Sequence, residues 1–420
     1  MKRSGLISQK SYLAKILFYL ILNLRSNYMN ILIVAPYVTF PDEPGANRFI
    51  AIAKILSEKY DITLVTSRFC HILKSHRSER KSLDGIKVIL LDEPGYRVNV
   101  SFGRLKSHHK FCENFQKFML TNQCKYDLVY SAYPLIKTNY ILGELKEKLG
   151  FKLVMDIQDI WPESIFGPIP LLSNHLGKLI LSPITKYANH TYAHADALVA
   201  VSETYMKRAD VKQLDNQYKE MVYIGADSLH FNSEISESGR KKIIATYIGT
   251  MSGSYDLETI VRASTLCHDQ VEIQFIGTGP HEERLKKLNS ELGGYVKFKG
   301  TMSYDHAMEE LKYSDIAINP IRSTAQQSIT NKLSDYFCCG LPILSCQENL
   351  EVQELLATGG GLYYQSGNSK DLAQKLILLA EDRVELDRMS TINKKIAEDC
   401  FLREKSYMKI VDLVDRLVEL

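Results

Sequence analysis

Long apolar runs, paired cysteines and the commonest nucleotide-binding signatures are all missing from this sequence of 420 residues. No run of about 18 or more uncharged apolar residues occurs, which excludes a polytopic membrane protein. The 8 cysteines form no C-x-x-C pair and no zinc-ligand spacing, so we expect reduced thiols and a cytoplasmic compartment. The absence of a G-x-G-x-x-G run and of a P-loop disfavours a dehydrogenase or an ATPase.

The composition is that of an ordinary globular protein, with 45% hydrophobic and 24% charged residues, and the length suits two or three domains. The net charge of +3 hides an asymmetry, because residues 1–225 hold 30 Lys and Arg against 20 Asp and Glu, whereas residues 226–420 hold 22 against 29. A basic first half is compatible with anionic lipid or a phosphorylated acceptor, and equally with scatter between two domains. No basic run interleaved with aromatic residues stands out, so nucleic acid is not an expected partner.

Residues 1–28 differ from the rest of the chain, because they hold five Lys and Arg and no acidic residue. Their apolar stretch, residues 16–22, is too short to span a bilayer, and no small-x-small cleavage site follows it. Three interpretations remain open for this basic extension. They are a start placed upstream of the true one at Met29, a short membrane-associating segment, and a weak export signal.

From Asn30 onward, short β-branched runs alternate with helical patterns, which is typical of parallel sheets flanked by helices. We predict an α/β protein of two doubly wound domains, at 29–226 and 243–400, that face each other across a cleft. A polar linker is expected at 227–242 and a final helical segment at 401–420. The predicted strands are 30–35, 61–66, 86–91, 127–131, 152–157 and 197–201 in the first domain and 243–248, 271–276, 296–298, 316–319, 342–345 and 361–363 in the second.

Ligands of such sheets bind beyond the carboxyl ends of the strands, and the loop at 36–48 follows the first predicted strand. It opens the first helix, where free backbone amides and the helix dipole suit a phosphate group. Gly45 would let the backbone approach that phosphate closely, and Arg48 stands at the end of the loop. Pro and Gly also mark any long loop, so a purely structural role stays open.

A second candidate segment follows the strand predicted at 152–157. It contains Gln158, Asp159, Glu163 and the only tryptophan of the chain, Trp161. Carboxylates in a cleft can orient an acceptor hydroxyl or take its proton, and the indole ring offers a flat apolar platform for sugar or lipid. The alternative is that Asp and Pro simply end a strand and cap a helix here.

Two further segments lie in the second predicted domain. Lys332 and Asp335 are three residues apart in a predicted helix and therefore share one face. A lysine beside helix amides suits a diphosphate, and a carboxylate one turn deeper can accept two hydrogen bonds from a ribose diol; the alternative is an ordinary surface ion pair. Gly277 and Gly279 follow a predicted strand and leave room for a base or a phosphate, although Gly-x-Gly turns are frequent.

Taken in order, these segments resemble the retaining family-4 glycosyltransferases with the two-Rossmann GT-B fold. The resemblance runs from Met29 to about Leu420 and is strongest between Ile243 and Gly367. Within that family, the run Asp159-Ile-Trp-Pro-Glu-Ser164 resembles a segment of bacterial enzymes that add N-acetylated amino sugars or deoxysugars during O-antigen or capsule synthesis. The resemblance implies transfer from a UDP-sugar, with retained anomeric configuration, to a lipid-linked saccharide at the cytoplasmic face of the inner membrane. It implies no metal ion and no other cofactor.

The resemblance also assigns residues to the two substrates. The first domain would bind the acceptor and the second the donor, and Asp335 would match the second acid of the family's E-x7-E motif. Closure of the domains would exclude water, and the final helix is expected to pack back on the first domain. The implied donor site comprises Gly45, Arg48, Thr250, Gly277, Gly279, Gln327, Lys332 and Asp335, and the implied catalytic site comprises Gln158, Asp159 and Glu163.

The chain departs from that family at three places. Gln158 stands where many members carry a histidine, Gln327 replaces the first acid of E-x7-E, and residues 248–251 lack the Arg and Lys that hold the diphosphate. Two other functions are therefore compared with a transferase. One is a UDP-N-acetylglucosamine 2-epimerase-like isomerase of the same architecture, and the other is a non-catalytic partner of another transferase. The cluster around Trp161 and the basic first half favour the transferase.

Overall fold

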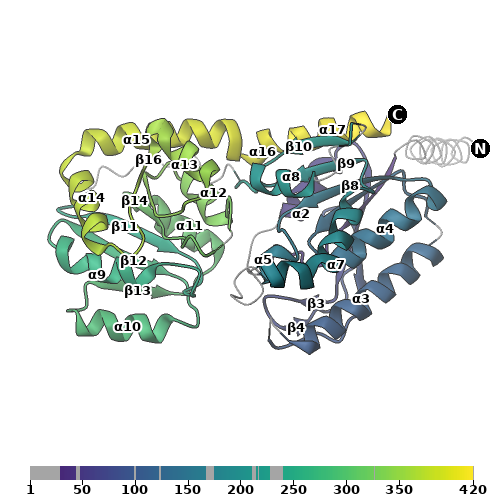
Figure 1. Ribbon diagram of the computed structural model, residues 1–420. Helices are drawn as coiled ribbons and strands as arrows, with labels where there is room; N and C mark the ends of the chain where they lie inside the picture. The colour runs from purple at the N-terminus through teal and green to yellow at the C-terminus, as the bar shows by residue number, and fades with distance from the viewer. Residues whose placement is uncertain are drawn as a thin grey trace, which may run out of the picture.

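The computed structural model describes residues 29–43, 48–98, 101–122, 124–166, 175–210, 214–215, 217–227, 240–325 and 327–419. Within these residues the chain forms two halves, each built on a sheet that is mostly or wholly parallel and flanked by helices (Figure 1). The basic extension at 1–28, most of the linker predicted at 227–242, and Gly45 lie outside the described residues. Among the described residues, no helix has both the length and the hydropathy needed to cross a membrane.

The first half contains a sheet of order β10-β9-β8-β7-β1-β2-β6-β5. All its strand pairs are parallel except β5 with β6. The central strands are buried along nearly their whole length, as expected for a sheet covered on both faces. The strands are β1 (Asn30–Val34), β2 (Asp61–Ser67), β5 (Ser82–Leu83), β6 (Ile86–Leu91), β7 (Leu128–Tyr133), β8 (Lys152–Ile157), β9 (Ala197–Ala200) and β10 (Tyr218–Met221).

Alternate residues of β1 supply two separate cores, because successive side chains of a strand point to opposite faces. Ile31 and Ile33 join a cluster with α2 (Arg48–Leu56) and α17 (Met408–Val418). Leu32 and Val34 join a second cluster on the other face. That face is covered by α3 (Phe102–Thr121), α4 (Ile136–Leu149) and α7 (His175–Tyr192).

The second half contains a parallel sheet of order β13-β12-β11-β14-β15-β16. Its strands are β11 (Ile243–Ile248), β12 (Val271–Ile276), β13 (Val296–Gly300), β14 (Ile316–Asn319), β15 (Ile343–Ser345) and β16 (Gly361–Tyr363). Its helices are α9 (Leu257–Cys267), α10 (Glu282–Glu291), α11 (Tyr304–Lys312), α12 (Asn331–Cys338), α13 (Leu350–Leu355), α14 (Ser369–Glu381) and α15 (Arg383–Ile396).

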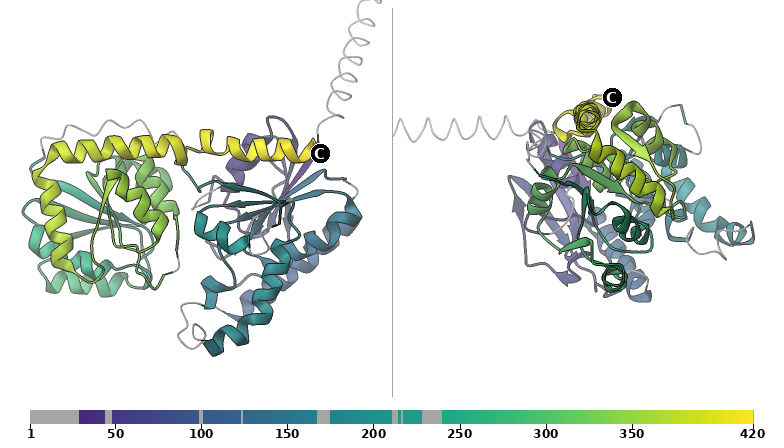
Figure 2. Two further views of the ribbon diagram at one scale, coloured as in Figure 1. Left: turned by 45° about the horizontal axis from the view of Figure 1, so that its top comes forward. Right: turned by 90° about the vertical axis from the view of Figure 1, so that its left-hand side faces the viewer.

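The C-terminal segment crosses from the second half to the first, through α16 (Arg403–Ser406) to α17 (Figure 2). Leu413 and Val414 of α17 are fully buried in the first-half core. Lys59 pairs with Asp415 at 2.7 Å, and Arg416 pairs with Glu220 at 2.8 Å. The last helix of the chain is therefore a structural part of the first half.

Several short elements of the first half lie outside the set predicted from the sequence. They are β3 (Phe69–Cys70), β4 (Ser75–His76), β5 and the edge strand β10. β3, β4 and β5 have two residues each, too few to show a hydrophobic period. β10 has the sequence Tyr-Lys-Glu-Met and is only half-buried. Its two charged residues leave no apolar pattern from which a strand could be predicted.

Candidate functional site

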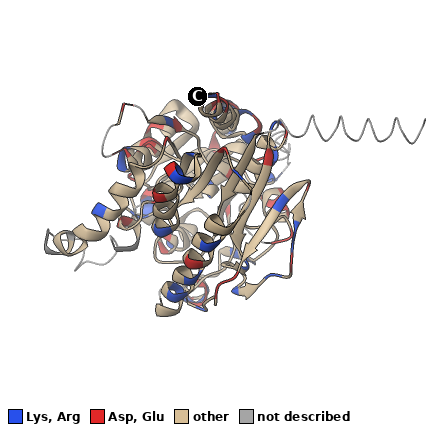
Figure 3. Ribbon diagram, turned by 90° about the vertical axis from the view of Figure 1, so that its right-hand side faces the viewer, with Lys and Arg blue, Asp and Glu red and all other residues tan. Residues whose placement is uncertain are grey.

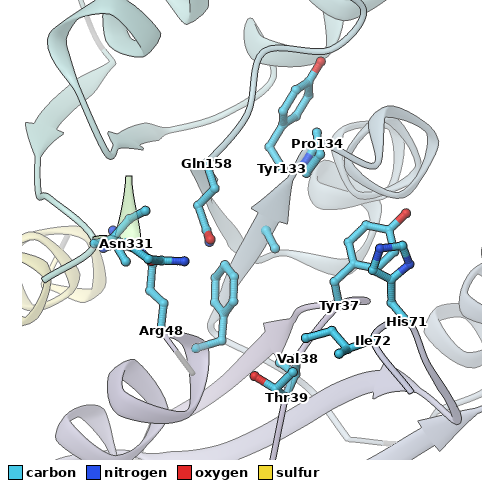
Figure 4. A pocket seen from close by; sticks show the side chains of 13 residues that line it. Tyr37, Val38, Thr39, Arg48, His71, Ile72, Tyr133, Pro134, Gln158 and Asn331 are labelled. Atoms are coloured by element: carbon cyan, nitrogen blue, oxygen red, sulfur yellow. The ribbon is translucent and has the colours of Figure 1, made fainter. Parts of the chain in front are cut away.

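A cavity of about 250 Å³ lies between the two halves, beyond the carboxyl ends of β1, β7 and β8 (Figure 4). The first half contributes Tyr37, Arg48, Tyr133 and Gln158 to its lining, and α12 of the second half contributes Asn331. The first-half sheet thus brings the predicted site residues Arg48 and Gln158 together in one cleft. This is the position at which doubly wound sheets bind their ligands.

Arg48 is the first residue of α2, and it is only 3% exposed. Its Nε donates to Asp156 Oδ2 at 2.9 Å, and its Nη1 donates to the Tyr223 carbonyl at 2.9 Å and to the Tyr407 hydroxyl at 3.3 Å. Tyr130 donates a further hydrogen bond to Asp156 Oδ2 at 2.7 Å. Burial alone would lower the pKa of Arg48, but the nearby Asp156 outweighs it, with help from Tyr407 and Tyr130, and raises this pKa above its usual range.

Polar atoms without partners mark the wall of the cleft. Arg48 Nη2 and Gln158 Nε2 are buried and have no hydrogen-bond partner among the described residues. Leaving a buried donor unsatisfied costs about 1–3 kcal/mol. Both side chains line the cavity, where Figure 4 shows them. A ligand with acceptor oxygens, such as a phosphate or a sugar, would satisfy these two donors.

The other two predicted catalytic residues have partners of their own. Asp159 accepts hydrogen bonds from the Ile160 amide at 2.8 Å and from Trp161 Nε1 at 3.0 Å. Glu163, at the start of α5 (Glu163–Phe166), pairs with Arg208 at 2.6 Å. Neither carboxylate is part of the lining of the 250 Å³ cavity. Asp159 therefore positions the indole ring, and its catalytic role and that of Glu163 remain predictions.

A wall of rings lies beside the cavity, and of its members only Trp161 was predicted from the sequence. We call Tyr37, His71, Tyr96, His108 and Trp161 the aromatic wall. His108 Nε2 lies 2.7 Å from the Tyr37 hydroxyl, and His71 Nδ1 lies 2.5 Å from the Tyr96 hydroxyl. The His108 ring stacks on Trp161 with a centroid separation of 6.2 Å. Tyr37 and His71 reach the cavity itself.

Both imidazoles of the aromatic wall are uncharged near neutral pH. Burial lowers the pKa of His71 to about 4, helped by Lys74 and Arg104, and lowers the pKa of His108 to about 3, helped by Arg104. A signal for this wall existed in the sequence. Residues 107, 108, 111, 112 and 115 have helical spacing and are all buried, so they lie on one face of α3.

The loops after β11 and β12 touch through their backbones. A side chain at Gly277 would place its Cβ 2.2 Å from the Gly249 carbonyl oxygen, and one at Gly279 would lie 2.4 Å from the Met251 carbonyl oxygen. Gly277 also has a positive φ of 123°, which favours glycine. The two predicted glycines are thus required for close backbone packing, and their contact with a base remains a prediction.

Lys332 lies directly beside these loops. A Cβ at Gly249 would lie 2.9 Å from Lys332 Cδ, and Lys332 Nζ donates to the Tyr255 hydroxyl at 2.8 Å. Arg322 is also tied to Tyr255, through its carbonyl at 3.3 Å, and pairs with Asp256 at 3.0 Å. Two cations therefore gather near the strand ends of the second half, where residues 248–251 lack any.

Asp335 lies one turn deeper in α12, as its spacing predicted, but it is only 7% exposed. It accepts a hydrogen bond from the Tyr304 hydroxyl at 2.7 Å. Burial raises its pKa to about 6, against the opposing effects of that hydrogen bond and of Arg403 and Lys332. A ribose would have to share this carboxylate with Tyr304.

Gln327 and Thr250 occupy separate places. Gln327 lines a second cavity of about 310 Å³, together with Ile160 of the first half and Arg322 of the second. Its Oε1 is buried without a partner among the described residues. Thr250 is exposed, and its carbonyl accepts a hydrogen bond from the Tyr247 hydroxyl at 2.8 Å. The structure brings Gln327 to the boundary of the halves and leaves Thr250 outside both cavities.

Residues 242–382 match the family model described as "Glycosyl transferases group 1". The match lies within the second half, which we call the group 1 domain. This domain includes the glycine loops, Lys332 and Asp335. No protein of curated function matches the chain in sequence.

Solved structures resemble the group 1 domain and the first half together. HepE of Anabaena in complex with UDP has a TM-score of 0.66 at 18% identity and covers 92% of this chain and 100% of its own. Sucrose-phosphate synthase of Thermosynechococcus elongatus has a TM-score of 0.69 at 14% identity, with coverages of 93% and 99%. WaaG, a glycosyltransferase involved in lipopolysaccharide biosynthesis, has a TM-score of 0.63 at 12% identity, with coverages of 91% of this chain and 99% of its own. The predicted GT-B fold is confirmed over both halves.

Proposed function

We propose that this protein is a retaining glycosyltransferase that moves a sugar from a UDP-sugar to a lipid-linked saccharide. The donor would carry an N-acetylated amino sugar or a deoxysugar, for a bacterial surface polysaccharide such as O-antigen or capsule. The observation that carries the proposal is the cleft between the group 1 domain and the first half. In its wall, Arg48 and Gln158 each have a buried hydrogen-bond donor without a partner among the described residues. The similarity to HepE, which was solved in complex with UDP, supports the choice of a UDP-sugar donor. The similarity to WaaG, which is involved in lipopolysaccharide biosynthesis, supports the choice of pathway.

The donor would be held mainly by the group 1 domain. The amides at the start of α12 and the Lys332 ammonium would face the diphosphate, and the close-packed glycine loops would leave space for the base. Arg322 adds a second cation near the same loops. This assignment supplies the positive charge that residues 248–251 do not.

The reaction would break the bond between the anomeric carbon and UDP and form a bond from that carbon to the acceptor oxygen on the same face. The proton of the acceptor hydroxyl would pass to the oxygen of the departing diphosphate. Negative charge grows on the leaving diphosphate, so cations and amides already in place stabilise the transition state. The Tyr37 hydroxyl and the neutral His71 imidazole, which reach the cavity, would bind hydroxyl groups of the acceptor sugar. No enzymic nucleophile and no metal ion are part of the proposal.

A product assay tests the proposal directly. The full chain is incubated with each of a panel of UDP-sugars, with and without a polyprenyl-diphosphate sugar, and products are identified by mass spectrometry. Acceptor-dependent UDP release and a product heavier by one sugar would support the transferase. Release without acceptor, together with a free epimerised sugar, would replace it by the epimerase. No turnover with any donor, together with UDP binding by calorimetry that is too weak to detect, would favour the non-catalytic partner.

Two variants connect the assay to the site. Lys332→Ala and Asp335→Asn should each lower kcat/KM by tenfold or more, because one hydrogen bond to a charged group contributes about 1.5–3 kcal/mol. Lys287→Ala is the matched control, since this lysine is 80% exposed on α10, and it should retain full activity. Equal losses in all three variants would point to a general loss of folded protein.

A further inference from the structure

A cluster of two histidines and one glutamate lies on the outer helices of the first half. Glu144 belongs to α4, His190 to α7, and His194 follows the end of α7. Their ligand atoms all lie within 4.8 Å of one another. None of the three lines either cavity between the halves. We propose that this cluster is a binding site for one divalent zinc ion, independent of the sugar-transfer cleft.

The distances fit a tetrahedral zinc ion. His190 Nε2 and His194 Nε2 are 3.2 Å apart, and His194 Nε2 lies 3.6 Å from Glu144 Oε1. Tetrahedral bonds of about 2.0–2.1 Å put neighbouring ligand atoms about 3.3 Å apart. Two imidazoles and one carboxylate are a common ligand set for zinc, and they suit magnesium and calcium poorly. A water molecule would take the fourth position.

The surroundings hold His194 in place. Lys146 Nζ donates to the His194 carbonyl at 2.9 Å and to Asp196 Oδ1 at 2.9 Å, which ties the residues after α7 to α4. Gly143 lies inside α4, and a Cβ there would come within 2.5 Å of His194 Cγ. Glycine weakens a helix interior, but here it creates the space that the imidazole occupies beside Glu144.

Zinc in this position would link α4 to α7. The two helices belong to the same covering layer of the first sheet, and the cluster lies where α7 ends. The carboxyl end of a helix carries partial negative charge, which favours a cation. The inferred role is a structural clamp on this layer, so it does not rest on the proposed transfer reaction.

Zinc titration of the full chain against a chromophoric chelator tests the site. We expect one equivalent of Zn²⁺ to bind and to raise Tm by about 2–4 °C. His190→Ala and His194→Ala should each weaken binding by about tenfold or more and remove the Tm shift. His306→Ala, an exposed histidine of α11, is the matched control and should bind like the unmodified chain.

Each of the following results would overturn the site. They are no zinc binding by the unmodified chain, unchanged affinity in both histidine variants, and an equal loss in His306→Ala. Exposed Glu144→Gln supplies a variant that keeps side-chain volume if an alanine variant fails to fold, and it too should weaken zinc binding. Gly143→Ala distinguishes a built site from a chance cluster, because it keeps all three ligands and displaces only the His194 ring. An unchanged zinc affinity in that variant contradicts the geometry proposed here.

Discussion

Arg48 and Asp156 form an ion pair under the cleft whose side chains are 2% and 0% exposed. Removing one partner of such a pair leaves a buried charge without compensation, at a typical cost of about 3–5 kcal/mol. We predict that Arg48→Met and Asp156→Asn each lower the free energy of unfolding by about that amount. The double variant should lose clearly less than the sum, as measured by urea denaturation. Strict additivity would show that the two charges do not stabilise each other.

Asp335 predicts a pH dependence of opposite sign to that of an ordinary surface carboxylate. Its pKa rises from 3.8 to about 6 in the folded protein, so the folded state binds this proton more tightly than the unfolded state. The stabilisation from its protonated form is fully present below pH 3.8 and is lost as the pH rises through 6. The difference in free energy of unfolding between Asp335→Asn and the unmodified chain should therefore shift in favour of the variant by up to about 3 kcal/mol from pH 4 to pH 8. A difference that stays constant between these pH values would contradict the prediction.

Single residues show where sequence information ends. The spacing of Lys332 and Asp335 predicted their shared helix, because helical period is a local property. It did not predict that Tyr304 hydrogen-bonds Asp335 or that Asp159 holds the ring of Trp161. The contact of His108 with Trp161 joins α3 to the loop after β8, and such pairings depend on how distant elements pack.

Among the elements, α17 gives the clearest test of how the halves are connected. Leu413 is fully buried against the first half, whereas Met408 of the same helix is 42% exposed. We predict that Leu413→Ala lowers the free energy of unfolding by about 2–5 kcal/mol. Met408→Ala should change it by less than about 0.5 kcal/mol. Equal effects would mean that α17 does not pack on the first half in solution.

The strands of the second half were predicted within two residues, because each is a short apolar run bounded by turns. β11, β12, β14 and β16 begin and end where the sequence indicated. The edge strand β10 and the two-residue strands of the first half were missed, since their pairing comes from neighbours in space. α2 begins at Arg48 in the described residues, after a loop whose predicted phosphate contact at Gly45 stays a prediction.

At the scale of the whole molecule, the first half exposes large apolar side chains on two of its outer helices. Phe102 and Leu105 of α3 are 91% and 65% exposed, and Leu179 and Ile180 of α7 are 70% and 61% exposed. Seen from this end of the molecule, Lys and Arg are interspersed with Asp and Glu along the ribbon (Figure 3). Apolar side chains, more than net charge, therefore distinguish this surface, and exposed apolar surface is a common mark of membrane contact.

The proposed lipid-linked acceptor leads us to predict that the protein binds vesicles containing anionic lipid. The double variant Phe102→Ser and Leu179→Ser should reduce the bound fraction in a flotation assay to half or less. Val384→Ser is the matched control, because this residue is 80% exposed on α15 of the second half, and it should bind normally. Equal binding by the double variant and the control would remove these helices from the membrane contact.

The position of α17 also has a consequence for how the protein is made. The helix packs on β1 and α2, which are translated before it, and the whole second half lies between them in the chain. The nascent first half therefore carries an uncovered apolar strip throughout synthesis of the group 1 domain. A chain that lacks α17 would therefore leave part of the first-half core uncovered.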